Sequence, residues 1–189
     1  SKLRFAREKP AFGGHRYKAV QGDHDDFDAH PLRQLVSAIP EQFWFGADYY
    51  AASLGDTQHT GSWLVWDKRL DETMDKIYGS CFELLWSQQR HKRDILRHRW
   101  AGIFGMEQEP HKSRMHPTQK PIALFEDLLQ RYASPDALIL DCFAGAGSLL
   151  MACERLGYRS RSCEIDPGYV AVTLQRWADL TGLTPALET

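Results

Sequence analysis

Residues 138–148 read Leu-Ile-Leu-Asp-Cys-Phe-Ala-Gly-Ala-Gly-Ser, and the prediction of the fold begins with this segment. A short apolar run ends in Asp141, a loop of small residues follows, and a helical pattern runs from Ser148 to Leu156. This order of strand, glycine loop and helix is how an α/β sheet presents a nucleotide-like ligand at its carboxyl edge. Gly145 and Gly147 have no Cβ, so the backbone can turn sharply and approach a ligand closely.

An acidic residue also ends the next predicted strand. The pattern from Tyr158 to Cys163 is followed by Glu164, and in a nucleotide-binding βαβ unit such a carboxylate can accept both ribose hydroxyls. A glycine loop alone is equally compatible with a tight left-handed turn that binds nothing. The spaced pair of Asp141 and Glu164, each at the end of a strand, is the stronger indication of a binding site.

The rest of the chain alternates predicted strands with helices. Buried strands are predicted at 43–45, 63–66 and 81–86, and a half-exposed strand with basic side chains on one face at 95–100. Helices are predicted at 31–38 with Asp28 as N-cap, at 121–132 beginning with Pro121, and at 170–180. In the last helix one face carries apolar side chains: Val170, Leu174, Trp177 and Ala178.

Three motifs of the C-terminal part occur in one order. His116-Pro-Thr-Gln-Lys-Pro121 comes before the helix, Asp-Cys-Phe-Ala-Gly-Ala-Gly-Ser follows at 141–148, and Glu-Ile-Asp-Pro-Gly-Tyr stands at 164–169. This series resembles the amino-group DNA methyltransferases, which transfer a methyl group from S-adenosylmethionine (SAM) to adenine N6 or cytosine N4. With the cofactor half last, the order is similar to that of their circularly permuted class. The resemblance is close over 115–177, looser over 43–100 and faint before residue 40.

The resemblance implies an α/β, Rossmann-like SAM-dependent methyltransferase fold, a mixed and mostly parallel sheet with flanking helices. We expect about six strands in one sheet, with Leu138–Asp141 at its centre. It implies SAM as the cofactor and DNA as the substrate. The expected target is the exocyclic amino group of adenine, in preference to cytosine, in a bacterial or phage restriction-modification setting.

The resemblance also implies the roles of single residues. Phe143, Ala144 and Gly145 would line the methionine end of SAM, and Asp141 would lie near its amino group. Glu164 would hold the ribose and Ile165 would pack on the adenine. Thr118 and Lys120 would approach the carboxylate, although Lys120 is also compatible with a plain surface cation. The whole predicted cofactor-binding set is His116, Thr118, Lys120, Asp141, Phe143, Ala144, Gly145, Gly147, Ser148, Glu164 and Ile165.

One expected motif is missing. In the family, a tetrapeptide Asp/Asn/Ser-Pro-Pro-Tyr/Phe holds the flipped target base, but the prolines of this sequence are all isolated. The catalytic residues are therefore unknown, and we expect that motif and its strand immediately before Ser1. The alternatives are a catalytically silent SAM-binding or DNA-binding remnant or subunit, and an RNA methyltransferase.

Charge is unevenly distributed along the chain. The net charge is −2, yet residues 1–18 carry six basic residues against one acidic, and residues 88–120 carry eight against three. Such segments suit a protein that grips phosphates at one face, although ordinary surface charge also fits. We expect Arg90, Arg97 and Arg99, with the N-terminal arm, to contact DNA, and Asp48 and Tyr49 to lie near the ligand at the sheet's carboxyl edge.

Length and composition indicate one domain, and the resemblance implies that it is a methyltransferase domain with the following parts. Residues 1–28 form a loop region, 29–100 a target-base half, 101–115 a short connector and 116–189 the SAM-binding half. The connector is too short for a recognition domain, so either the sequence specificity is short and loose, or a homodimer partner or a separate specificity domain supplies it. No apolar run reaches the ~20 residues of a membrane span, and no signal-peptide pattern opens the chain, so a cytoplasmic protein is expected. The cysteines lack a C-x-x-C pair and predict reduced core thiols without a metal site.

Overall fold

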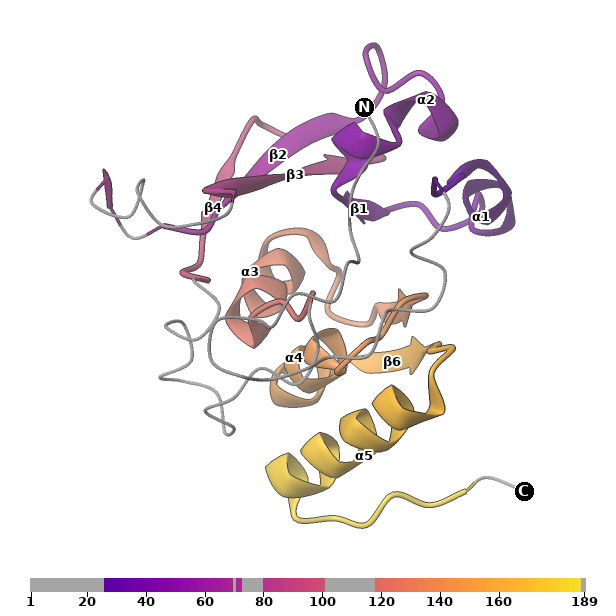
Figure 1. Ribbon diagram of the computed structural model, residues 1–189, viewed down its shortest axis with the longest axis vertical. Helices are drawn as coiled ribbons and strands as arrows, with labels where there is room; N and C mark the ends of the chain where they lie inside the picture. Colours follow the sequence, from indigo (N-terminus) through magenta and orange to yellow (C-terminus); the bar gives the residue numbers. More distant parts are fainter. Residues whose placement is uncertain (1–25, 70, 73–79, 101–117, 188–189) are drawn as a thin grey trace. The chain divides into compact units, whose positions relative to one another are not determined.

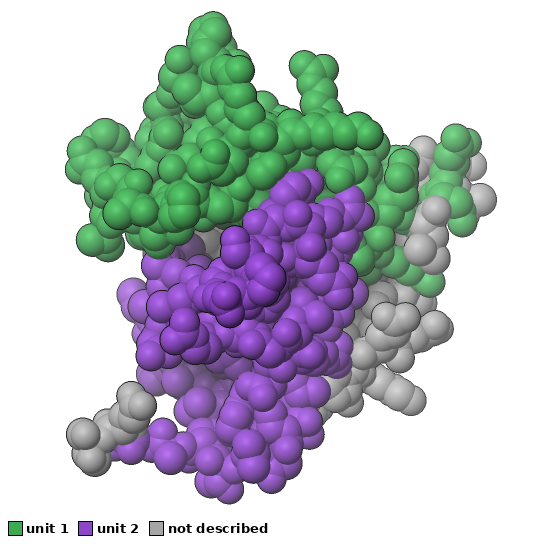
Figure 2. All heavy atoms as spheres, turned by 180° about the vertical axis from the view of Figure 1, so that it is seen from behind, with its two compact units in different colours: residues 1–99 green, residues 100–189 purple. Residues whose placement is uncertain are grey.

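The computed structural model describes residues 26–69, 71–72, 80–100 and 118–187. The chain divides into two compact units, residues 1–99 and 100–189, which Figure 2 shows in different colours. The first unit ends one residue before the end of the target-base half predicted at 29–100. His116, the basic N-terminal arm and the predicted connector at 101–115 lie outside the described residues.

The first unit is built around a four-stranded sheet in the order β1-β3-β2-β4 (Figure 1). The strands are β1 (Phe43–Phe45), β2 (Ser62–Asp67), β3 (Phe82–Ser87) and β4 (Ile95–Arg97). β3 pairs antiparallel with both β1 and β2, while β4 runs parallel to β2. The helical segments are α1 (His30–Leu35), the 3₁₀ turn η1 (Ala47–Tyr49) and α2 (Ala51–Leu54). This sheet is mixed, as predicted, but it is not mostly parallel, because two of its three pairings are antiparallel.

Alternation along the strands places large side chains on both faces of this sheet. Leu64, Trp66, Leu85 and Leu96 are buried on one face, and Trp86 is buried on the other. The guanidinium of Arg33 in α1 lies 4.8 Å from the centroid of the Trp86 ring, so a cation covers that indole.

Two local predictions in this unit need correction. The N-cap of α1 is Ala29 rather than Asp28, although the Asp28 carboxylate still accepts a hydrogen bond from the His30 N–H at 2.9 Å. The strand predicted at 95–100 ends at Arg97, because only Ile95–Arg97 pairs with β2. The alternation of basic side chains therefore continues only as far as Arg97, and Arg99 lies outside the strand.

The second unit contains a βαβ unit followed by a long helix. Its elements are α3 (Ile122–Tyr132), β5 (Leu138–Asp141), α4 (Ser148–Leu156), β6 (Arg159–Ser162) and α5 (Pro167–Thr181). β5 and β6 are parallel neighbours, in the register that pairs Leu138 with Arg159 and Asp141 with Ser162. Pro121 is the N-cap of α3 rather than its first residue, and its extended ψ of 143° lies outside the helix.

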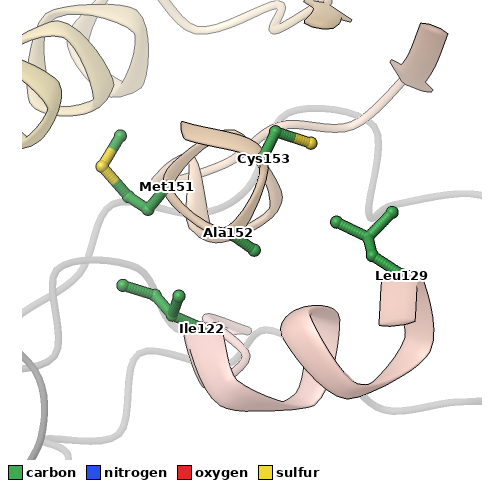
Figure 3. Packing of buried hydrophobic residues seen from close by; sticks show 5 residues of the cluster. All are labelled: Ile122, Leu129, Met151, Ala152 and Cys153. Carbon is green, nitrogen blue, oxygen red and sulfur yellow. The ribbon is translucent and has the colours of Figure 1, made fainter. Parts of the chain in front are cut away.

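The core of this unit lies between α3 and α4. Ile122 and Leu129 of α3 and Met151, Ala152 and Cys153 of α4 are buried together. Figure 3 shows Ala152 pointing toward α3 between Ile122 and Leu129, so the small side chain lets the two helices pack closely. Burial raises the pKa of the Cys153 thiol to about 11. Cys163, in contrast, is exposed, so the prediction that the cysteines are core thiols is wrong for this residue.

The expectation of one sheet with Leu138–Asp141 at its centre is wrong for the described strands. They form two sheets, and β5 pairs with β6 alone among them. Ile139 packs against the core, whereas Leu138 and Leu140 point to the opposite face and are 55% and 41% exposed. Within the described residues, one face of the β5–β6 pair is thus left uncovered.

The apolar face predicted for the last helix is also wrong in part. Val170 and Leu174 are exposed, and the buried residues of α5 are Thr173 and Arg176. Trp177 does pack against the core of the unit. The polar pair is buried because its side chains bind backbone carbonyls of the glycine loop, as described below. Among the described helices, none has both the length and the apolar character that crossing a bilayer requires.

Candidate functional site

The glycine loop joins β5 to α4 by a tight turn. Gly145 and Gly147 have φ angles of 53° and 75°, in the left-handed region that favours glycine. A Cβ on Gly147 would lie only 2.5 Å from Cγ2 of Thr173 in α5. Position 147 therefore requires glycine for two reasons, its backbone conformation and its close approach to the last helix.

Glu164 ties the loop to the end of β6. One carboxylate oxygen accepts a hydrogen bond from the Gly145 N–H at 2.7 Å, and the other accepts from the Asp166 N–H at 2.9 Å. The backbone adds two links, from Ala144 N to Cys163 O and from Cys163 N to Asp141 O. Each carboxylate oxygen has a second lone pair, so Glu164 can hold the loop and still accept from hydroxyl groups of a ligand.

Asp141 stands at the base of the same loop. Its carboxylate accepts a hydrogen bond from the Phe143 N–H at 3.0 Å, which fixes the first residues of the turn. Burial raises the pKa of Asp141, while that hydrogen bond and the nearby Lys120 ammonium act in the opposite direction. Lys120 is therefore close enough to influence the Asp141 carboxylate electrostatically.

Two apolar side chains flank the loop in an exposed position. Phe143 is 66% exposed and Ile165 is 73% exposed. They follow Asp141 and Glu164 respectively, so both stand at the carboxyl ends of the parallel strands. Exposed apolar side chains beside a glycine loop offer packing surfaces to a flat or aliphatic part of a ligand.

The other predicted cofactor-binding residues of this unit occupy different environments. Ala144 and Gly145 are half-buried within the turn, and Ser148 is buried at the start of α4. The Ser148 hydroxyl has no hydrogen-bond partner within the described part of the chain. Thr118 is exposed and Lys120 is half-buried, both just before α3.

Sequence reasoning missed two residues of α5 that support the loop. The Thr173 hydroxyl donates to the carbonyl of Gly145 at 3.1 Å, and the Arg176 guanidinium donates to the carbonyl of Ala146. Arg176 is 2% exposed, so its charge is placed in the interior for this contact. The available signal was the i, i+3 spacing of these polar residues, which puts them on one stripe of the helix.

The predicted DNA-contacting residues belong to the first unit. Arg90 and Arg97 are exposed, and Arg90 donates to the carbonyl of His59 at 2.9 Å. Arg99 is half-buried, and its Nε is buried with no hydrogen-bond partner among the described residues. Arg99 is therefore not displayed on the surface as Arg97 is. Asp48 and Tyr49 are exposed in η1, directly after β1.

Comparison with known proteins shows which family has a sequence like this one. Residues 37–175 match the model of the N6/N4 DNA methylase family. The chain is 34% identical over 55 residues to the type II methyltransferase M1.MboII of Moraxella bovis, covering 29% of this chain and 21% of that protein. It is 33% identical over 61 residues to M.HpaI of Haemophilus parainfluenzae, covering 32% and 19% respectively. The matched segments thus span about a fifth of these relatives.

A solved structure shows the same fold. The cytosine-N4-specific PvuII DNA methyltransferase aligns with a TM-score of 0.52 at 17% identity, covering 69% of this chain and 57% of that one. The family model covers well over half of the sequence, from before β1 into the last helix. The chain belongs to the N6/N4 DNA methylase family.

Proposed function

We propose that this chain binds SAM at the glycine loop and takes part in methyl transfer to an exocyclic amino group of DNA. The observation that carries the proposal is the turn between Asp141 and Glu164, in which the Glu164 carboxylate accepts from the Gly145 N–H at 2.7 Å. This contact fixes the loop and the acidic side chain as one unit at the carboxyl ends of β5 and β6.

The residues present fit the chemistry of SAM. Glu164 offers free lone pairs to the two ribose hydroxyls, and Ile165 offers an apolar surface to the adenine. Phe143, Ala144 and Gly145 would line the methionine end, and the Asp141 carboxylate would face its amino group. Thr118 and Lys120 would meet the carboxylate, for which the ammonium of Lys120 is the suitable partner. His116 completes the proposed set from outside the described residues.

The part of this chain in the reaction is positioning. When bound, SAM supplies an electrophilic methyl group on a sulfonium centre, and in-line displacement depends above all on the alignment of donor and acceptor. Glu164 would fix the ribose, and the loop backbone would fix the amino-acid end. Thr173 and Arg176 hold the loop carbonyls and so keep this geometry rigid.

The finer assignments are proposals of the same kind. We assign adenine in preference to cytosine as the target, the permuted order of motifs, and DNA contacts by Arg90 and Arg97. An amino group inside a duplex is unreachable, so the target base must be flipped out. The sequence contains no Pro-Pro dipeptide for that step. The catalytic residues therefore stay unassigned, and a catalytically silent SAM-binding subunit is the second candidate.

Calorimetry tests the cofactor site. SAM should bind with micromolar affinity, and Glu164→Ala should weaken binding at least tenfold, which is about 1.4 kcal/mol. Glu126→Ala is the matched control, because Glu126 lies on α3 and not in the glycine loop. Its carboxylate oxygen Oε1 forms an ion pair with Arg155 Nη1 at 3.2 Å. Equal affinities of the Glu164 and Glu126 variants would contradict the assignment of Glu164.

A transfer assay separates the candidate functions. The protein is incubated with SAM carrying a tritiated methyl group and with unmethylated DNA or RNA, and the labelled nucleoside is identified. N6-methyladenine in DNA is the expected product. Tritium label found in RNA would mean that RNA, and not DNA, is the substrate. SAM binding without label in DNA or RNA would favour the catalytically silent subunit.

A further inference from the structure

A hollow in the first unit lies apart from the glycine loop in sequence and carries none of the predicted cofactor residues. Its volume is about 860 Å³. It is lined by the loop 57–61, by Ser62, Trp63 and Val65 of β2, and by residues between Arg90 and Arg97. A space of this size falls within the range of ligand-binding clefts in proteins.

The floor of the hollow is aromatic and aliphatic. Val65 pairs directly with Ile95, and Trp63 lies two residues earlier on the same strand, so all three side chains share one face of the sheet. Ile95 is 41% exposed, whereas Leu64 and Leu96 on the opposite face are fully buried. Trp63 and Val65 are half-buried, so part of this apolar surface stays open to solvent although Trp86 is buried on the same face.

The position of the Trp63 ring is fixed. Its indole N–H donates to the carbonyl of Thr57 at 3.2 Å, which ties the ring to the loop that forms one wall. The same loop is held at a second point, because the Arg90 guanidinium donates a hydrogen bond to the carbonyl of His59, a residue of that loop. An aromatic ring held in this way can stack on a planar group without first losing much conformational freedom.

The rim of the hollow is basic. Arg90, Arg93 and Arg97 line it, and Asp94 is the acid among the described lining residues. Arg97 lies 4.0 Å from the Asp67 carboxylate, but that carboxylate has a closer partner in Arg69 at 2.9 Å. The Arg97 side chain remains 65% exposed, so its guanidinium is available to an anion.

We propose that this hollow binds one unstacked nucleotide of the DNA strand, with its phosphate on Arg93 and Arg97 and its base against Trp63. The inference rests on the proposed function for its choice of ligand. An anion alone would need only the arginines, and an apolar ligand would need only the floor. A nucleotide carries both a phosphate and a planar base, and aromatic rings with basic neighbours are how proteins hold unpaired strands.

Binding of fluorescein-labelled DNA, followed by anisotropy over a range of salt concentrations, tests the phosphate contacts. The slope of log K against log salt is about −0.7 per phosphate contact for a single strand, so Arg93→Ala and Arg97→Ala should each flatten it by roughly that amount. Lys92→Ala is the matched control, since Lys92 is an exposed cation beside Arg93 that does not line the hollow. Equal effects of Lys92→Ala and Arg93→Ala would overturn the proposal.

The base contact has its own test. Trp63→Leu should weaken single-stranded DNA about tenfold while leaving the salt slope unchanged, because a stacked base carries no charge. A DNA strand containing 5-iodouracil should crosslink on irradiation to the peptide that contains Trp63, identified by mass spectrometry. This readout uses the unaltered protein and does not depend on the stability of a variant. Crosslinks confined to other peptides would overturn the assignment.

These outcomes are separable from those of the proposed function. SAM calorimetry on the Arg93, Arg97 and Trp63 variants should give the affinity of the unaltered chain. If these variants bind SAM, transfer methyl groups and bind DNA as the unaltered chain does, the proposal of a nucleotide site in the hollow is wrong, and the proposed function is unaffected. Loss of SAM binding in the Glu164 variant tests only the cofactor site. Tighter binding of RNA of the same sequence, sensitive to the same variants, would replace DNA as the ligand of the hollow.

Discussion

Gly147 is held by two constraints that single substitutions can separate. Its φ angle is 75°, and a Cβ there would lie 2.5 Å from Thr173 Cγ2. Gly157, which ends α4, has nearly the same φ of 76°, but a Cβ at that position would meet no atom within 4 Å. The two glycines therefore share the conformational strain of an added side chain and differ in the clash.

We expect Gly157→Ala to lower the free energy of unfolding by about 1–2 kcal/mol, the cost of a left-handed conformation for a residue with a Cβ. Gly147→Ala should cost about 1–3 kcal/mol more, because the loop or α5 must also shift to relieve the overlap. Urea unfolding of both variants measures the difference. If both variants lose the same free energy of unfolding, α5 moves away from the loop at little cost, and the contact between Gly147 and Thr173 is not rigid.

At the scale of elements, α5 supports the loop through hydrogen bonds to consecutive carbonyls. Thr173 binds Gly145 O at 3.1 Å and Arg176 binds Ala146 O. Thr173→Val keeps the shape of the side chain but removes the hydroxyl, so the loop loses one anchor. The expected result is a weakening of SAM binding by about fivefold, on the order of 1 kcal/mol, the net value of one hydrogen bond.

Thr173→Ser is the control for this prediction, because serine keeps the hydroxyl and loses only the methyl group. Calorimetry with SAM should give nearly the original affinity for Thr173→Ser, and urea unfolding should show both variants folded. If Thr173→Ser binds as weakly as Thr173→Val, packing of the methyl group and not the hydrogen bond holds the loop.

The same helix shows how far sequence patterns reach. The βαβ segment was predictable because its strands, glycines and helix are local in sequence, and β5 and α4 have the predicted bounds. The roles of Thr173 and Arg176 were not, since an amphipathic pattern assumes that the buried stripe is apolar. Here the buried stripe satisfies carbonyls of a loop about 30 residues earlier, which is a tertiary effect.

At the scale of the whole molecule, strand pairing was the least predictable feature. The positions of β1, β2 and β3 follow from their aromatic and aliphatic runs, but a run does not specify its neighbour. β2 pairs with β3 across the segment between them, and β4 joins β2 in parallel rather than extending β3. The hollow depends on this order, because it brings Arg97 beside Asp67 and Ile95 beside Val65.

The division into two units predicts that each ligand protects its own unit. A ligand that binds only the folded state adds stability in proportion to its excess, about 2.7 kcal/mol at a concentration of 100 Kd. If the units open separately, this stability appears only in the unit that holds the ligand. Hydrogen exchange with saturating SAM should therefore slow at 143–147 and along α4 and α5, and remain unchanged in β1–β4.

A single strand of DNA should give the complementary pattern, with slower exchange at 57–63 and at 90–97 and little change around the glycine loop. Lys92→Ala serves as the control, since it should leave both patterns as they are. Equal protection of both units by SAM alone would mean that they open as one cooperative body. Protection by both ligands together that exceeds the sum of their separate effects would show instead that binding at one unit favours binding at the other.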